Sequence, residues 1–125
     1  MDQIAADNIT LGKQAENLAC QYLQKNGLQL ELANYRCKQG EIDLIMQDND
    51  QLVFVEVRYR KNNHFGTGAD TVDNRKQHKL ILAANHYLSV TNKHNSACRF
   101  DVISISGRID FKNINWITNA FICKI

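Results

Sequence analysis

Hydrophobic residues along the chain recur first at helical spacing, then at strand spacing, and then repeat this order. The segment from about Thr10 to Asn26 carries apolar residues three or four positions apart, which indicates an amphipathic helix that ends at Gly27. A second helical pattern runs from about Asp70 to Ser89. We expect its buried face to be marked by Val72, Leu80, Ala83, Ala84 and Tyr87.

Alternating and β-branched segments predict five strands around these helices. They are expected at about 28–35, 40–46, 52–58, 99–106 and 114–121, with the last strand at an edge of the sheet. The order is therefore helix, three strands, helix, two strands. This order predicts an α/β fold in two or three layers, with a central mixed β-sheet flanked by helices. Since 125 residues are the size of one domain, we expect a single domain over 1–125.

The second and third strands are separated by a short polar turn, which allows their register to be predicted. If the loop is at 49–50, paired positions sum to 99, so that Asp43 lies opposite Glu56 and Glu41 lies opposite Arg58. Directly opposed Cβ atoms are roughly 4.5–5.5 Å apart, and two carboxylates that close repel each other unless a cation lies between them. Asp43 and Glu56 are therefore candidate ligands of a divalent metal ion such as Mg²⁺.

Three further charged residues are candidates for the same site. Arg58 points to the same face of its strand as Glu56 and can bind a phosphate. Glu16 lies at the border of the apolar stripe of the first helix, and Lys76 lies within the stripe of the second helix. Each also has an ordinary interpretation: a salt-bridged strand surface, a solvated glutamate, and a lysine that extends from the stripe to water.

Charge and composition exclude few classes of partner. The net charge is only +2, so it neither requires nor excludes a polyanion. No signal-peptide pattern and no run of about 18 apolar residues occurs, and we expect a soluble, cytoplasmic protein without a membrane partner. The four cysteines lack the spacing of a zinc site, which favours reduced thiols.

Nucleic acid, if bound, is expected to contact the basic residues Arg58, Arg60, Lys61, Lys76 and Lys79, which otherwise only add solubilising charge.

Several stretches resemble the signature of the YraN family of small, uncharacterised bacterial proteins. They are Gly40–Ile45, Val53–Arg60, Arg99–Val102, the pair Gly12 and Glu16, and Lys76. That family is similar in turn to the restriction-endonuclease-like PD-(D/E)XK superfamily, which includes archaeal Holliday junction resolvases. The resemblance implies a restriction-endonuclease-like fold, a DNA substrate, Mg²⁺ or Mn²⁺ as the cofactor, and a homodimer as one possible assembly.

The same resemblance implies a role for each candidate residue. Asp43 and Glu56 would bind the metal directly, together with the main-chain carbonyl of Val57. Glu16 would act through a water molecule, while Lys76 would contact the scissile phosphate.

Arg58 would contact that phosphate as well, but it departs from the nuclease pattern, which usually has lysine at this position. Arginine stays protonated, so it can stabilise charge on a phosphate but cannot act as a general base. The leading hypothesis is a metal-dependent DNA endonuclease, with branched DNA as one candidate substrate. Two alternatives stay open. One is a non-catalytic nucleic-acid-binding or adaptor protein on a nuclease-like scaffold, and the other is a structural partner whose acidic cluster is neutralised internally.

Overall fold

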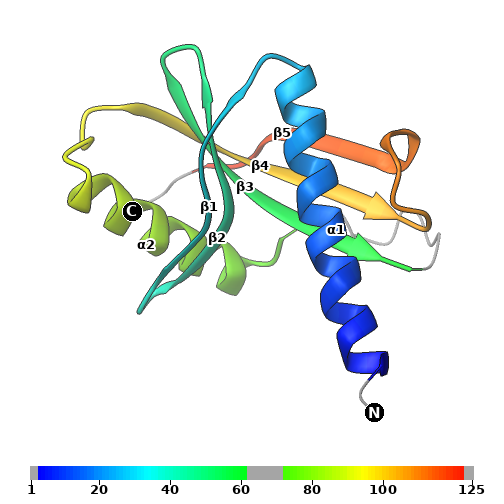
Figure 1. The fold of residues 1–125 in the computed structure, drawn as a ribbon. Coiled ribbons are helices and arrows are strands. Elements are labelled where there is room, and N and C mark those ends of the chain that lie inside the picture. The colour runs from blue at the N-terminus through cyan, green and yellow to red at the C-terminus, as the bar shows by residue number, and fades with distance from the viewer. Residues whose placement is uncertain (1–2, 62–71, 123–125) are drawn as a thin grey trace.

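A five-stranded sheet with one α-helix on each face forms the structure (Figure 1), a computed structural model that describes residues 3–61 and 72–122. The elements are α1 (Gln3–Lys25), β1 (Gln29–Cys37), β2 (Gly40–Asp48), β3 (Gln51–Arg60), α2 (Asn74–Val90), β4 (Ala97–Ser106), the 3₁₀ turn η1 (Phe111–Asn113) and β5 (Ile114–Phe121). The strands lie side by side in chain order. Only the β3–β4 pair is parallel among these strands. The predicted mixed α/β architecture is confirmed, in three layers, and it agrees with a restriction-endonuclease-like fold.

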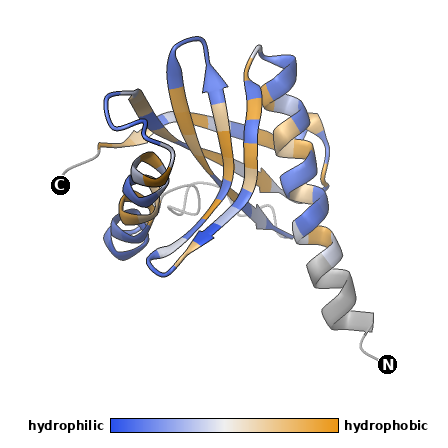
Figure 2. Cartoon of the chain, turned by 60° about the vertical axis from the view of Figure 1, so that its left-hand side comes forward, coloured by the Kyte–Doolittle hydropathy of each residue, from blue (hydrophilic) through white to orange (hydrophobic). Residues whose placement is uncertain are grey.

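Two groups of buried side chains hold the helices on opposite faces of the sheet, as Figure 2 shows. On one face, Leu80 and Tyr87 of α2 pack against a core that contains Phe54 of β3. On the other face, Ala19 of α1 packs in a core that contains Val55 of β3. Even-numbered and odd-numbered residues of β3 therefore contact different helices, as strand alternation requires. This central strand connects both halves of the molecule.

The helix boundaries agree with the sequence at the C-terminal end of α1 and differ at both helix starts. Gly27 adopts a φ of 94°, and Leu28 N–H donates to Leu23 O over 3.1 Å, which is a Schellman termination. However, α1 begins at Gln3 instead of Thr10 and projects beyond the sheet (Figure 1). Periodicity therefore underestimated the length of this helix.

The second helix begins at Asn74, with Asp73 as its N-cap. The predicted start at Asp70 lies outside the described residues. Val72 is buried, as expected, but it precedes the helix instead of forming its first turn. Leu80, Ala83, Ala84 and Tyr87 are buried as predicted.

The predicted register of the β2–β3 hairpin is confirmed from Leu44 to Asp48 of β2, and the predicted Asp43–Glu56 and Glu41–Arg58 pairs lie beyond this ladder. The pairs run from Asp48–Gln51 to Leu44–Val55, and the positions of each pair sum to 99. Asn49, the first residue of the turn, adopts a φ of 54°, a left-handed conformation that asparagine tolerates. No helix within residues 3–61 and 72–122 has the length and apolar character needed to cross a membrane.

Candidate active site

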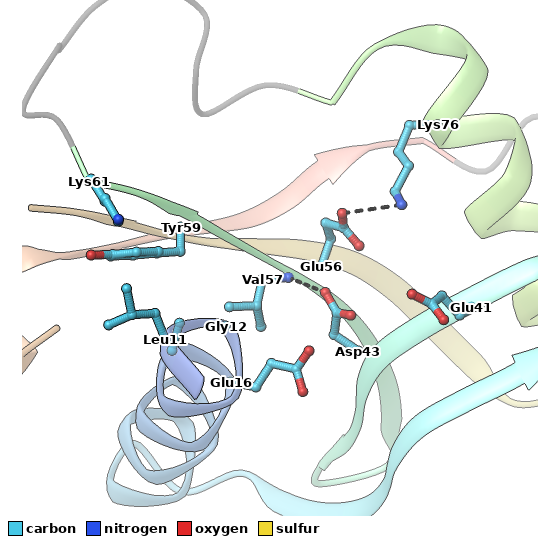
Figure 3. Close-up of a pocket in the computed structure, with 11 residues that line it drawn as sticks. Leu11, Gly12, Glu16, Glu41, Asp43, Glu56, Val57, Tyr59, Lys61 and Lys76 are labelled. Atoms are coloured by element: carbon cyan, nitrogen blue, oxygen red, sulfur yellow. Dashed lines mark hydrogen bonds and ion pairs between the residues drawn. The ribbon is translucent and has the colours of Figure 1, made fainter. Parts of the chain in front are cut away.

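Asp43 lies at the position where the regular side-chain alternation of β2 is broken. Ile42 packs in the core below α2, whereas Leu44, two positions later, packs in the core below α1. At this point the main-chain N–H of Val57 donates a 2.8 Å hydrogen bond to Asp43 Oδ2. The Asp43 carboxylate is thus held against the edge of β3, and Figure 3 shows it beside Val57 and Glu56.

Glu56 is the second acid of the site and lines the same cleft as Asp43 (Figure 3). Its side chain is only 12% exposed. Burial, followed by the charge of Asp43, raises the pKa of Glu56 to about 7. Burial also raises the pKa of Asp43, although the Val57 N–H opposes that shift. The two carboxyl groups therefore retain a proton more strongly than ordinary acids do, which is typical of acids placed close together.

Lys76 and Glu16 approach this pair from the two helices (Figure 3). Lys76 Nζ lies 3.5 Å from Glu56 Oε2, and its main-chain N–H is held by the Asp73 side chain at 2.9 Å. Glu16 lies on the α1 side, where burial, and then the charge of Asp43, raises its pKa. Both residues occupy the positions that the apolar stripes of their helices predicted.

A cleft of about 480 Å³ brings these groups together. It is lined by Leu11, Gly12, Ala15, Glu16, Glu41, Asp43, Glu56, Val57, Tyr59, Lys61 and Lys76. Four separate elements contribute to it, namely α1, β2, β3 and α2. A Cβ atom added at Gly12 would meet no atom within 4 Å, so this glycine lines open space. The sequence predicts that the acidic residues and Lys76 lie close together, and the structure places them in one cleft.

The predicted basic residues are distributed over more than one surface. Lys61 lines the cleft itself. Arg58 and Arg60 line an adjoining hollow of about 550 Å³, which also touches Glu56 and Lys76. Lys79 lines neither of these cavities. Its main-chain oxygen lies close to Gly40, only 3.4 Å from the position that a Cβ atom would take if Gly40 were replaced.

Two features of the site differ from the sequence-based expectation. Glu41 pairs with Arg36 of β1 in the sheet, and their side chains form an ion pair of 3.3 Å. Neither the predicted Glu41–Arg58 pair nor the predicted Asp43–Glu56 pair belongs to the regular β2–β3 ladder. The regular β2–β3 ladder extends only as far as Leu44–Val55, and Arg58 lies beyond it. Strand alternation predicts that Tyr59, three positions after Glu56, points to the opposite face of β3. It packs against the α1 core and still lines the cleft, because the cleft extends across the end of β3 to the α1 face.

The donor set for a metal ion is small. Among residues 3–61 and 72–122, no group of three or more His, Cys, Asp or Glu side chains is arranged to hold a metal ion. The candidate ligands among these residues are therefore the two carboxylates of Asp43 and Glu56, to which main-chain oxygens and water would have to be added.

Comparison with known proteins places the chain in a family. The model of the uncharacterised protein family UPF0102 matches residues 15–105, which is most of the chain. The chain belongs to the UPF0102 family. A UPF0102 protein of Nitrosococcus oceani is 51% identical over 111 residues, covering 88% of this chain and 90% of its own. UPF0102 proteins of Pseudomonas fluorescens and Pseudomonas putida are 50% and 46% identical and cover 88% and 95% of this chain, and 91% and 98% of their own.

The UPF0102 match confirms the resemblance to the YraN family that the sequence motifs indicated. Its span includes α1 from Ala15 onward, the β2–β3 hairpin, α2 and almost all of β4. Glu16, Asp43, Glu56 and Lys76 all lie within it. The elements that build the cleft are therefore the elements that define the match to the UPF0102 family.

Proposed function

We propose that this UPF0102 protein binds DNA at the cleft and hydrolyses phosphodiester bonds with Mg²⁺ or Mn²⁺. The observation that carries the proposal is the Asp43–Glu56 pair, two acids that line one cleft beside Lys76. Keeping two acids together at low exposure destabilises their charged forms, and such arrangements concentrate at functional sites. A divalent cation would remove the repulsion, so the pair is best explained as its binding site.

The residues present fit a hard divalent ion. Both candidate side chains are carboxylates, which Mg²⁺ and Mn²⁺ prefer. In a strand, the N–H and C=O of one residue point toward the same neighbouring strand, so the carbonyl of Val57 is directed to the side on which its N–H meets Asp43. Mg²⁺ normally keeps several waters and takes only one or two protein carboxylates, and this donor set is of that size.

When bound, the ion would polarise the phosphate and lower the pKa of an attacking water. Lys76 reaches the same cleft from α2 and would hold a phosphate oxygen, because its ammonium is released once Glu56 engages the ion. Glu16, on the opposite side of Asp43, would orient a water molecule. Arg58, in the adjoining hollow with Glu56, would stabilise charge that develops on the phosphate. The resemblance to PD-(D/E)XK nucleases supports these roles.

Metal-dependent thermal stabilisation tests the site first. A ligand that binds only the folded state raises the melting temperature, so Mg²⁺ or Mn²⁺ should stabilise the wild-type protein. Asp43→Asn should remove this response, whereas Glu41→Gln, at the exposed rim of the same cleft, should keep it. Linear, nicked and four-way DNA should then be cleaved by the wild type and not by Asp43→Asn. If neither Mg²⁺ nor Mn²⁺ changes the melting temperature of the wild-type protein, the proposed metal site is wrong.

Arg58 favours a second candidate, a nucleic-acid-binding or adaptor protein without turnover. Arg58 stands where the usual nuclease pattern has a lysine. Because arginine stays protonated, it cannot take up a proton from water and so cannot act as a general base. On this alternative the basic hollows bind nucleic acid, and the acid pair is neutralised by Lys76. Salt-sensitive DNA binding without any product, at every Mg²⁺ and Mn²⁺ concentration, would select this candidate over hydrolysis.

A further inference from the structure

A second basic hollow adjoins the cleft on the side of the β4–β5 connection. Its volume is about 640 Å³, and it is lined by Tyr59, Lys61, Gly107, Arg108, Asp110, Lys112 and Asn113. Tyr59 and Lys61 line both the cleft and this hollow. The two cavities therefore adjoin at the end of β3.

The hollow is built on fixed main chain. Tyr59 Oη donates to Gly107 O over 3.0 Å, and Gly107 N–H donates to Arg60 O over 2.8 Å. Gly107 adopts a φ of 81°, a conformation that favours glycine. The Asn113 side chain closes the connection with a 2.8 Å hydrogen bond to Arg108 O. The main chain at Arg108 is consequently held next to the end of β3.

The charge of the hollow is strongly positive. Lys61, Arg108 and Lys112 supply three cationic side chains, and Asp110 is the single acid of the lining. The Asp110 carboxylate is already engaged, because it caps η1 by accepting from Lys112 N–H at 3.1 Å. Three cations around a cavity of this size suit a ligand with more than one negative charge.

We propose that this hollow binds phosphates of the nucleic-acid strand that continue beyond the phosphate in the carboxylate cleft. This inference rests on the proposed function, since it assigns the neighbouring part of the same substrate. A nucleic-acid backbone fits because it repeats a negative charge along a continuous chain, and the two cavities meet at Tyr59 and Lys61. Arg108 and Lys112 thereby become phosphate contacts outside the reaction site.

Salt-dependent DNA binding tests the assignment. Fluorescence anisotropy would be measured with a labelled single-stranded and a labelled duplex oligonucleotide, in EDTA so that no metal-dependent cleavage occurs. Loss of one phosphate contact lowers the slope of log K against log salt by about 0.7 for single strands or about 0.9 for duplex DNA. Arg108→Gln and Lys112→Gln should each show this loss together with weaker binding.

Lys93→Gln is the matched control, because it also removes one surface cation. Lys93 lies before β4 and Arg108 after it, so they are separated by the whole length of β4, or roughly 30 Å. Lys93→Gln should leave both affinity and salt slope unchanged. All three variants should melt like the wild type and respond to Mg²⁺ equally, which separates lost contacts from misfolding.

The outcomes distinguish this inference from the proposed function. If the wild type binds DNA but Arg108→Gln and Lys112→Gln behave like Lys93→Gln, the assignment of the hollow fails and the proposed function survives. If the wild type binds neither oligonucleotide at low salt, both fail. If anionic lipid vesicles bind instead, with the same sensitivity to Arg108 and Lys112, the hollow is a membrane contact and the nucleic-acid assignment is overturned.

Discussion

Lys76 Nζ lies 3.5 Å from Glu56 Oε2, an ion pair that joins the first turn of α2 to β3. The lysine side chain is 41% exposed, whereas that of Glu56 is 12% exposed, so the ammonium reaches inward from the rim. This contact lowers the pKa of Glu56, but burial and the charge of Asp43 raise it by more. The protonation of Glu56 therefore depends on which cation occupies the cleft.

The metal-free protein should lose stability as the pH rises from about 4.5 to about 7. Glu56 has a pKa near 7 in the folded state and 4.5 as its ordinary value, so over this interval the folded protein holds a proton that the unfolded chain releases. The free energy of unfolding then falls with pH, by on the order of 3 kcal/mol in total, and stays lower above pH 7. Urea unfolding in EDTA at a series of pH values measures this.

Glu56→Gln should remove that decline, because the amide does not titrate. The variant should unfold like the wild type near pH 4 and be more stable than the wild type at pH 8. Glu41→Gln, an exposed acid on the rim of the same cleft, should keep the wild-type pH dependence. Saturating Mg²⁺ should also restore stability above pH 7 in the wild type. A wild-type stability that rises between pH 5 and 7 would contradict the raised pKa of Glu56.

Lys76→Gln should weaken DNA binding without removing the metal response. The substitution deletes the cation that lowers the pKa of Glu56, so the pH-dependent loss of stability should shift to higher pH. It should also reduce the salt slope of DNA binding by about one phosphate contact. Lys79→Gln is its control, since Lys79 is on the same helix and outside the cleft lining. Equal effects of the two substitutions would show that only overall charge matters.

Glu16→Gln should separate metal binding from turnover. Glu16 approaches from α1, and its placement suits a role through water more than direct coordination. The variant should therefore keep most of the Mg²⁺-induced rise in melting temperature and lose cleavage by about 10²-fold or more, the scale of a lost proton-transfer group. Glu31→Gln, an acid outside this cleft that pairs with Lys93, should change neither quantity. Loss of the metal response in Glu16→Gln would instead make this residue a direct ligand.

Much of the site could be predicted because strand register is a local property. A two-residue turn at 49–50 determines which residues of β2 and β3 face each other, and β3 alternates strictly enough to place Glu56 toward α2. The apolar stripes of the helices then predict that Glu16 and Lys76 approach the sheet. Each of these inferences uses neighbours within one hairpin or one helix, where periodicity is informative.

The parts that could not be predicted depend on irregular geometry or distant packing. The alternation of β2 breaks at Asp43, where the β2–β3 ladder ends, so neither Asp43 nor Glu41 forms a regular ladder pair with β3. Tyr59 enters the cleft because β3 extends to its edge, and the hollow beside it depends on the β4–β5 connection around Gly107. Neither arrangement leaves a periodic signal in the sequence.

The contacts of Asp101 in the core also leave no periodic signal in the sequence. They allow a prediction of stability that does not depend on the proposed function. The Asp101 side chain is 0% exposed and accepts hydrogen bonds from Arg99 Nε at 3.0 Å, Trp116 Nε1 at 3.0 Å and Asn119 N–H at 2.9 Å. It thereby joins β4 to β5 across the register shift between Phe100 and Val102. An asparagine here keeps one acceptor oxygen, but its NH2 group would face donors, so at least one donor loses its acceptor and Arg99 loses the buried negative charge.

Asp101→Asn should therefore lower the free energy of unfolding by about 3 kcal/mol or more, the range for breaking one partner of a buried ion pair. Trp116 is the single tryptophan of the chain and bonds directly to Asp101, so its fluorescence reports urea unfolding at the affected site. Asp48→Asn is the matched control, because Asp48 also pairs with Arg99 at 3.0 Å but is 31% exposed and should cost about 1 kcal/mol or less. Equal losses in the two variants would contradict a special role for the buried carboxylate. The Mg²⁺-induced rise in melting temperature should persist in both, since neither residue lines the cleft.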